Sequence, residues 1–334
     1  MKRTALIPYR KSLDNEKRCL LILPCSFYSF AGVVERGLKE LGYATVVAND
    51  EYPQSMLGKI MGKLGLPLAQ KITRRVLKQK YLNDQHYDLV LVIKGRGLDK
   101  ETAAELCLYG DKVVGYHFDS FGYDRGPARW SKCLPRVCTF DYRDAAEHGL
   151  PVVELFTSMP QIIKAGGPRY RVSAIMRNHS ERLKYLDQVL RAFSNQPSFI
   201  YIFEANLLSI ISNFVRHPFL YWKYKNYISR KPLPYDDYVQ VIAESDFTID
   251  YAHPKQTGIT IRCFEALSTG TRLITNNFFV KNCSLFDQAN PIIFPSGTET
   301  QALLEKVILH DTHKPVAVRR TVNDFLMDLI EPRG

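Results

Sequence analysis

The chain has 334 residues, of which 46% are hydrophobic and 24% charged, a composition typical of globular domains. This length suits two domains better than one. It contains no run of about 18 uninterrupted apolar residues that could span a bilayer, and its N-terminus lacks the apolar core of a signal peptide. We therefore expect a cytoplasmic protein, either free or peripheral at the inner face of the plasma membrane, and its formal charge of +11 indicates an anionic partner.

In the first half, short apolar runs alternate with helical patterns, which predicts a parallel sheet with crossover helices. The strands are expected at 19–23, 44–48, 89–94, 112–116 and 137–140, and the helices at 32–41 and 99–108. Asp141 and Asp144 are expected to cap the helix that follows. Residues 53–80 interleave seven Lys and Arg with apolar residues and contain no acid. That stretch suits an anionic membrane surface, or else a solvated helix packed on its own domain.

Residues 158–169 carry Pro and Gly and are interpreted as an interdomain linker. A second series follows, with strands expected at 170–176, 198–203, 247–251 and 272–275, and helices at 180–193, 235–244 and 260–269. Residues 315–329 have the spacing of a terminal helix. The predicted fold class is α/β, with two Rossmann-like, doubly wound domains at 1–157 and 170–334 that face a cleft and bind ligands at the carboxyl ends of their strands.

Residues 214–230 mix aromatic residues with cations. Interfacial membrane anchors and nucleic-acid platforms share this pattern. An aromatic connection inside the second domain is an equally good interpretation.

The most informative segment, 250–277, has the pattern strand, loop, helix, strand. Gly258 would let the backbone approach a ligand, Thr260 can cap the helix, and the first-turn amides form a site for phosphate oxygens. Arg262 lies in that first turn, where a cation is unfavourable unless an anion binds nearby. Glu265 shares its face, and a carboxylate there can accept hydrogen bonds from ribose hydroxyls. The alternative is a surface ion pair between Arg262 and Glu265.

The run from Gln256 through Glu265 to Gly270, with residues 273–277, resembles the donor-domain signature of GT-B glycosyltransferases from bacterial capsule and lipopolysaccharide gene clusters, distantly of the CgeB type. Residues 139–144 and 149–156 resemble the last strand before the linker in the same group. The resemblance covers about 100 residues. It implies a nucleotide-sugar donor, with Glu265 on the ribose and Arg262 on the diphosphate.

The other residues of this loop are candidates for the same donor site. Gln256, Gly258 and Thr260 lie within the matching run, and His253 borders it, either as a donor contact or as a hydrogen-bonding loop residue. Retaining enzymes usually carry two glutamates separated by seven residues. Thr257 stands where the first would be, so retention of configuration is not supported.

An inverting displacement needs a base that deprotonates the acceptor hydroxyl. His117 and Asp119 follow the 112–116 strand and would stand at the cleft, and Asp119 is favoured. Either could instead be structural, Asp119 in a turn and His117 in the core. Lys94 and Arg96 stand beside glycines at the end of another strand and could contact an anionic acceptor or the donor phosphate, although such a segment also makes an ordinary turn.

No metal or other cofactor is expected. The chain has no Asp-x-Asp motif, and its seven cysteines form no CxxC pair. We therefore expect reduced, buried thiols, and a leaving diphosphate stabilised by helix amides with Arg or Lys.

The predicted function is transfer of a sugar from a nucleotide-sugar donor to an anionic glycolipid or glycan acceptor of a surface polysaccharide. A sugar-nucleotide epimerase of the same fold is one alternative. A non-catalytic scaffold, or a basic protein that binds nucleic acid or a membrane surface, is another. No helix-turn-helix, RNA-recognition or zinc signature is present, so no specific nucleic acid is expected as a partner.

Overall fold

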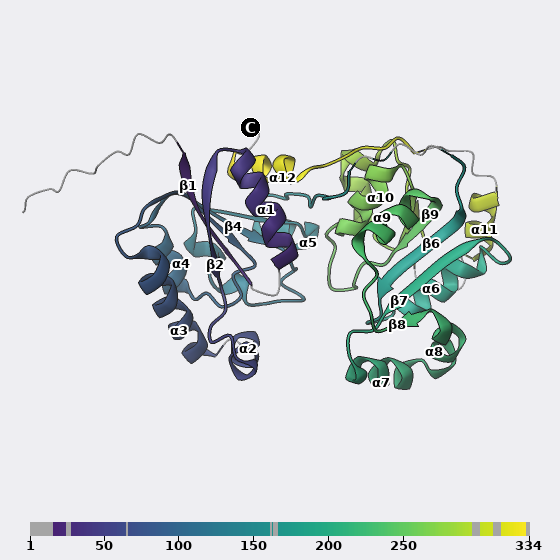
Figure 1. The fold of residues 1–334 in the computed structure, drawn as a ribbon, viewed down its shortest axis with the longest axis horizontal. Coiled ribbons are helices and arrows are strands. Elements are labelled where there is room, and N and C mark those ends of the chain that lie inside the picture. The colour runs from purple at the N-terminus through teal and green to yellow at the C-terminus, as the bar shows by residue number, and fades with distance from the viewer. Residues whose placement is uncertain are drawn as a thin grey trace, which may run out of the picture. The chain divides into compact units, whose positions relative to one another are not determined.

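The structure is a computed structural model that describes residues 16–24, 28–64, 66–160, 162, 166–295, 301–309 and 315–331. It contains two sheets with helices packed on them, which confirms the predicted α/β class of two Rossmann-like sheets (Figure 1). By compactness the chain divides into a first unit, residues 1–115 and 129–136, and a second unit, residues 116–128 and 137–334. The predicted boundary at residue 157 follows the sheets, whereas the compact units divide the chain within β4 and β5.

The first sheet has five strands in the order β2-β1-β3-β4-β5. Its elements are β1 (Lys17–Leu23), α1 (Tyr28–Glu40), β2 (Tyr43–Asn49), α2 (Met56–Lys63), α3 (Pro67–Leu77), β3 (Tyr87–Ile93), α4 (Lys100–Leu106), β4 (Gly110–His117), β5 (Arg136–Thr139) and α5 (Tyr142–His148). Strand β1, next to the edge strand β2, pairs in parallel with β2 and β3, and its last five residues are buried. Helices α3 and α4 lie on one side of this sheet and α1 on the other (Figure 1).

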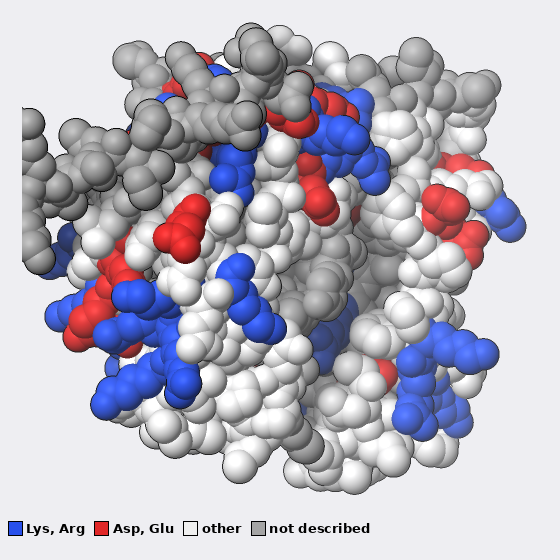
Figure 2. Space-filling view, turned by 60° about the vertical axis from the view of Figure 1, so that its left-hand side comes forward, with Lys and Arg blue, Asp and Glu red and all other residues white. Residues whose placement is uncertain are grey.

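Two cations of the predicted basic face at 53–80 are paired with acids of the same unit. Arg74 forms ion pairs with Asp99 and Glu101 of α4, and Lys78 pairs with Glu105 at 2.6 Å. These pairs cannot be recognised from the sequence, because the acids lie 25 to 27 residues further along the chain. Figure 2 shows basic and acidic side chains interspersed on one face of the molecule.

The second sheet has six strands in the order β11-β10-β9-β6-β7-β8, all paired in parallel. Its elements are β6 (Tyr170–Arg177), α6 (Arg182–Arg191), β7 (Ser198–Phe203), α7 (Leu207–Arg216), α8 (Pro218–Tyr224), β8 (Ile228–Ser229), α9 (Tyr235–Ala243), β9 (Ser245–Asp250), α10 (Ile261–Thr269), β10 (Arg272–Thr275), β11 (Ile292–Ile293) and α11 (Gln301–Leu309). Read in order of appearance, the strands run 3-2-1-4-5-6, the order of a Rossmann fold. Successive strands are added on one side of β6 up to β8 and on its other side from β9 onward, so the boundary between β6 and β9 is the switch point where such sheets bind ligands.

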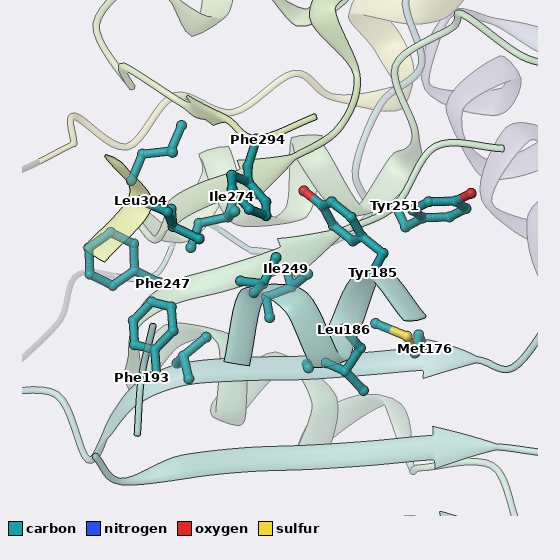
Figure 3. Packing of buried hydrophobic residues seen from close by; sticks show 14 of the residues in the cluster. Met176, Tyr185, Leu186, Phe193, Phe247, Ile249, Tyr251, Ile274, Phe294 and Leu304 are labelled. Carbon is teal, nitrogen blue, oxygen red and sulfur yellow. The ribbon is translucent and has the colours of Figure 1, made fainter. Parts of the chain in front are cut away.

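Both faces of this sheet are covered by apolar side chains. On one face Phe193 packs on Phe247 and Tyr185 on Tyr251, with ring centroids 5.5 and 5.3 Å apart (Figure 3). Leucines of α6 and α11 complete this cluster. On the other face, residues of α9 pack around Ile175 of β6. Burial on both sides explains the nearly continuous hydrophobic runs from which the strands could be predicted.

Some predictions about the linker and the C-terminal helix are corrected by the structure, and others fall on residues that the structure does not describe. The terminal helix α12 covers only Val322–Ile330, and Phe325 packs on Tyr116 and Phe156 within the second unit. Residues 161 and 163–165 of the predicted linker lie outside the described residues, as does Cys25. Met159, also in that linker, is a fully buried core residue.

The six described cysteines are free thiols, but Cys107 and Cys133 are only partly buried. Within the described ranges, none of the helices combines the length and hydropathy that crossing a membrane requires.

One buried carboxylate of the first unit makes stability depend on pH. Asp50 follows β2, has no exposed surface, and accepts the backbone N–H of Arg96 at 2.9 Å. Burial, reinforced by the charge of Glu51, raises its pKa from 3.8 to about 8. Folded Asp50 therefore keeps its proton to a higher pH than unfolded Asp50 does.

We predict that Asp50→Asn loses less stability than the wild type when the pH rises from 4 to about 8, because the unfolded wild type alone releases this proton over that window. Urea unfolding at pH 5 and pH 8 measures the difference. Glu35→Gln, which changes an exposed acid on α1, is the control and should behave like the wild type. An equal pH dependence of Asp50→Asn and the wild type would contradict the assignment.

Candidate active site

A cavity of about 260 Å³ lies at the switch point of the second sheet, and all of its lining residues belong to the second unit. It is lined by Phe118, Asp119, Phe140, Leu155, Arg182, Asp250, Gln256, Thr260, Ile261, Arg262 and Glu265. Asp250 is the last residue of β9, and Arg182 opens the helix that follows β6. The two strands at the switch point thus each deliver a charged residue to the cavity.

Two guanidinium groups enter this cavity. Arg262 Nη1 lies 3.5 Å from Asp250 Oδ1, and the guanidinium of Arg182 donates to the carbonyls of Arg177 and Tyr251. Among the described residues, the Nε–H groups of Arg182 and Arg262 are buried without a hydrogen-bond partner. Burial and the charge of Arg262 lower the pKa of Arg182 to about 10, so it remains charged at neutral pH. Two desolvated cations with unused donors create a strong preference for an anion.

Glu265 lies beside Arg262 at the base of the cavity and is 8% exposed. It accepts the phenol hydrogen of Tyr238, a residue of α9 whose hydroxyl also bonds to Arg262. Burial raises the pKa of Glu265, and the bonds from Tyr238 and the charge of Arg262 oppose this rise. The alternative of a surface ion pair is therefore wrong, because the carboxylate is buried and held by a tyrosine.

Thr260 occupies the N-cap position of α10, as expected, but its side chain makes no cap hydrogen bond to the helix. Its hydroxyl instead lies 3.0 Å from Asp250 Oδ1 and donates to it. Asp250, only 1% exposed, therefore binds both Thr260 and Arg262. The hydroxyl of Thr260 is therefore bonded to the carboxylate of Asp250 at the end of β9 and not to an amide of the helix.

The loop before α10 is held by Asp141, the N-cap residue of α5. As expected, Asp141 accepts the N–H groups of Arg143 and Asp144. It also accepts the N–H groups of Thr257 and Gly258 at 2.5 and 3.2 Å. A side chain at Gly258 would meet the ring of Phe140 at 2.2 Å.

These contacts give Gly258 a packing role, and its approach to a ligand stays a prediction. The glycine lets the backbone approach Phe140, and its amide is bonded to Asp141. Packing at this position is too tight for any side chain.

Asp119 and His117 differ sharply in position. Asp119 is partly exposed, lines the cavity, and accepts a long 3.5 Å hydrogen bond from the amide of Gln256. His117 has no exposed surface and packs on Phe121 with ring centroids 4.7 Å apart. Burial lowers the pKa of His117 to about 3, so its ring is neutral. The expectation that His117 stands open at a cleft is wrong, because the ring is enclosed in apolar surroundings.

His253 lies at a different cavity of about 680 Å³ in the same unit. That cavity is polar, and its lining includes Arg177, His179 and Arg216. The ring of His253 packs edge-on against Tyr123 and its Nδ1 accepts the N–H of Lys255. The alternative interpretation of His253, as a residue that forms a hydrogen bond within its loop, therefore matches the observed bond to Lys255.

Lys94 and Arg96 lie in the first unit, directly after β3. Lys94 has a left-handed backbone with φ of 67°, and Arg96 lies 3.7 Å from Glu51. The neighbouring glycines serve packing, since a side chain at Gly97 would meet the carbonyl of Asp50 at 1.9 Å. The segment is thus a tightly packed turn, and its contact with a ligand stays a prediction.

Sequence reasoning missed Arg182 and Tyr238. A signal for Arg182 was present, because it stands in the first turn of a helix after a strand, as Arg262 does, and the same dipole argument applies to both. Tyr238 carries no comparable signal, since its role depends on α9 packing beside α10. In the described part of the chain no group of three or more His, Cys, Asp or Glu residues could hold a metal ion.

Comparison with known proteins agrees with this architecture. Residues 199–323 match the family described as "Glycosyl transferase-like". No curated protein matches the sequence.

Solved structures of similar fold include AviGT4, a glycosyltransferase involved in avilamycin A biosynthesis, at 11% identity, with a TM-score of 0.53 and coverage of 94% of this chain and 93% of that one. HepE of Anabaena, solved with UDP and glucose, has 11% identity, a TM-score of 0.54 and coverage of 94% and 96%. The UDP-GlcNAc 2-epimerase of Methanocaldococcus jannaschii has 11% identity, a TM-score of 0.53 and coverage of 92% and 97%.

The fold is that of the GT-B class, which serves both a transferase and an epimerase among these structures. The family match lies on the second sheet and includes the helix that carries Arg262 and Glu265. The chain accordingly has the GT-B fold, and residues 199–323 carry a domain of the glycosyltransferase-like family.

Proposed function

We propose that the protein transfers a sugar from a nucleotide-sugar donor to a hydroxyl of an anionic glycan or glycolipid acceptor, with inversion and without a metal ion. The main supporting observation is that the half-buried side chains of Arg182 and Arg262 line one cavity together with Glu265, and that each arginine keeps a buried Nε–H without a hydrogen-bond partner. A nucleoside diphosphate offers phosphate oxygens to the two guanidinium groups and ribose hydroxyls to the carboxylate of Glu265. HepE, of similar fold, was solved with UDP and glucose.

The leaving diphosphate develops negative charge as the bond to the sugar breaks. Arg182 and Arg262 would stabilise that charge from a partly desolvated position, and the first turn of α10 adds its dipole. Both arginines are already held by protein oxygens, so little reorganisation accompanies the reaction. This arrangement would do the work that a metal ion does in other diphosphate sites.

Asp119 is the proposed base. It is the partly exposed carboxylate of the cavity, and the Gln256 amide orients it. Asp119 would take the proton of the acceptor hydroxyl as its oxygen attacks the anomeric carbon, while the diphosphate leaves from the opposite face. Such a single displacement inverts the configuration at that carbon.

The larger polar cavity supports an anionic acceptor. Arg177 and Arg216 line it together with His253 and several serine and asparagine residues. Burial and the charge of Arg182 lower the pKa of His179 in its wall to about 3, so that ring acts as a neutral hydrogen-bonding group. Phosphorylated sugars, such as those of a lipopolysaccharide core, combine the charge and hydroxyl groups that this lining would recognise.

We predict that nucleoside diphosphates stabilise the wild type against heat without added metal, because a ligand of the folded state raises its melting temperature. Arg182→Gln should weaken diphosphate binding about 10- to 100-fold, the value of one or two charge-assisted hydrogen bonds. Lys184→Gln, which removes an exposed charge from the same helix, is the control and should bind normally. A panel of diphosphates that differ in base also identifies the donor. Absence of any shift, or equal losses in both variants, would contradict the proposal.

We predict that Asp119→Asn slows hydrolysis of the donor by water about 100-fold or more, because the amide cannot accept the proton, while diphosphate affinity stays within about twofold. Water replaces the acceptor in this assay, and released nucleoside diphosphate is measured. Asp246→Asn, an acid on β9 away from the cavity, should hydrolyse the donor at the rate of the wild type. Hydrolysis by Asp119→Asn at that same rate would exclude Asp119 as the base.

A further inference from the structure

Helix α7 carries its apolar side chains on its outer surface. Leu207, Leu208, Ile211 and Val215 are 59%, 79%, 59% and 73% exposed. The last three follow Leu207 by one, four and eight positions, which puts all four side chains in a single stripe along the helix. A helix packed on a domain normally turns such a stripe toward the core.

The inward side of α7 is polar and anchored by hydrogen bonds. Asn213 is buried and donates to Glu204 and to the carbonyl of Asn178. Ser209 donates to the other oxygen of Glu204 and completes a capping box with Asn206. These bonds hold the helix in this orientation, so the exposed stripe is its stable arrangement.

Helix α8 extends the same surface. Phe219 and Trp222 lie one turn apart and are 89% and 67% exposed, and Phe214 of α7 packs on Tyr221 of α8 with ring centroids 5.7 Å apart. Figure 1 shows α7 and α8 beside each other next to β8, the edge strand of the sheet. We call the exposed side chains at positions 207, 208, 211, 214, 215, 219 and 222 the α7–α8 face.

The chain segment that carries this face is basic. Residues 205–235 contain five Lys and Arg and no Asp or Glu. Lys225 stacks on the ring of Trp222, with its Nζ 3.7 Å from the ring centroid. Two acids approach this segment. Asp187 of α6 pairs with Lys223, and Glu181, the residue before α6, pairs with His217. An apolar stripe with tryptophan and a positive rim is the pattern of a helix that lies in a lipid interface.

We propose that the α7–α8 face inserts shallowly into the surface of an anionic phospholipid bilayer. A second copy of the chain is a poorer occupant, because a two-fold interface would bring the same positive rim against itself. Lipid contact through this face goes beyond the transfer reaction and does not depend on it. It would keep the enzyme at a surface where lipid-linked acceptors are concentrated.

The two tryptophans of the chain make this contact measurable. Trp130 is fully buried and Trp222 is exposed, so a blue shift of emission on adding vesicles reports on Trp222. We expect that shift, together with co-sedimentation, with vesicles of phosphatidylglycerol and phosphatidylcholine in equal parts. Vesicles of phosphatidylcholine alone should bind at least about tenfold more weakly, and added salt should weaken the anionic binding.

The double variant Ile211→Glu and Val215→Glu should lower the partition coefficient at least about tenfold, because two charges would enter the apolar interface. Leu108→Glu changes a leucine that is 75% exposed in the first unit and should bind vesicles as the wild type does. Trp222→Phe should lose the spectral shift and still sediment. An unchanged melting temperature and diphosphate affinity in the double variant separate lipid contact from folding and from the proposed function.

Three results would overturn the proposal. The first is a wild type that binds neither vesicle, or both equally. The second is a double variant that sediments like the wild type. The third is concentration-dependent self-association that the double variant abolishes without any lipid binding, since this would assign the α7–α8 face to a second copy.

Discussion

The candidate active site depends on one buried carboxylate that does not line its cavity. Asp141 is 1% exposed and uses its two oxygens for different tasks. Oδ1 caps α5 and binds the hydroxyl of Thr257, while Oδ2 accepts the backbone N–H groups of Thr257 and Gly258. On the other side of the loop, Asn277 donates to the carbonyls of the same two residues. The backbone that leads into α10 is thereby fixed, and with it the positions of Gln256 and Arg262.

The fold could be predicted well where local pattern and tertiary packing agree. The strands at 198–203 and 272–275 match the predicted bounds, because parallel strands covered on both faces appear as short apolar runs. Helices α7 and α8 were not predicted as helices, although the apolar residues of α7 have helical spacing, and the sequence does not reveal that its apolar stripe faces outward. Long-range ion pairs, such as Arg74 with Asp99, cannot be recognised from spacing along the chain.

Several residues of the candidate site could be predicted from the sequence, but most of their spatial arrangement could not. Arg262 and Glu265 do share a cavity, because three positions along a helix put both on one face. The packing of Gly258 on Phe140 was not predicted, since a glycine needed for close packing looks the same in sequence as one needed for a ligand. Tyr238 comes from another helix, and only the packing of α9 beside α10 brings it to Glu265.

Asp141 is thus expected to set the geometry of the proposed diphosphate site without contacting the ligand. Calorimetric titration of Asp141→Asn with the nucleoside diphosphate tests it most directly, because an amide can keep Oδ1 as the cap of α5 but cannot replace Oδ2 as an acceptor. Asp99→Asn, which alters a helix cap in the first unit, is the matched control. We predict that Asp141→Asn stays folded and binds the nucleoside diphosphate at least about tenfold more weakly than the wild type does. Asp99→Asn should bind it normally. A folded Asp141→Asn with wild-type affinity would contradict it.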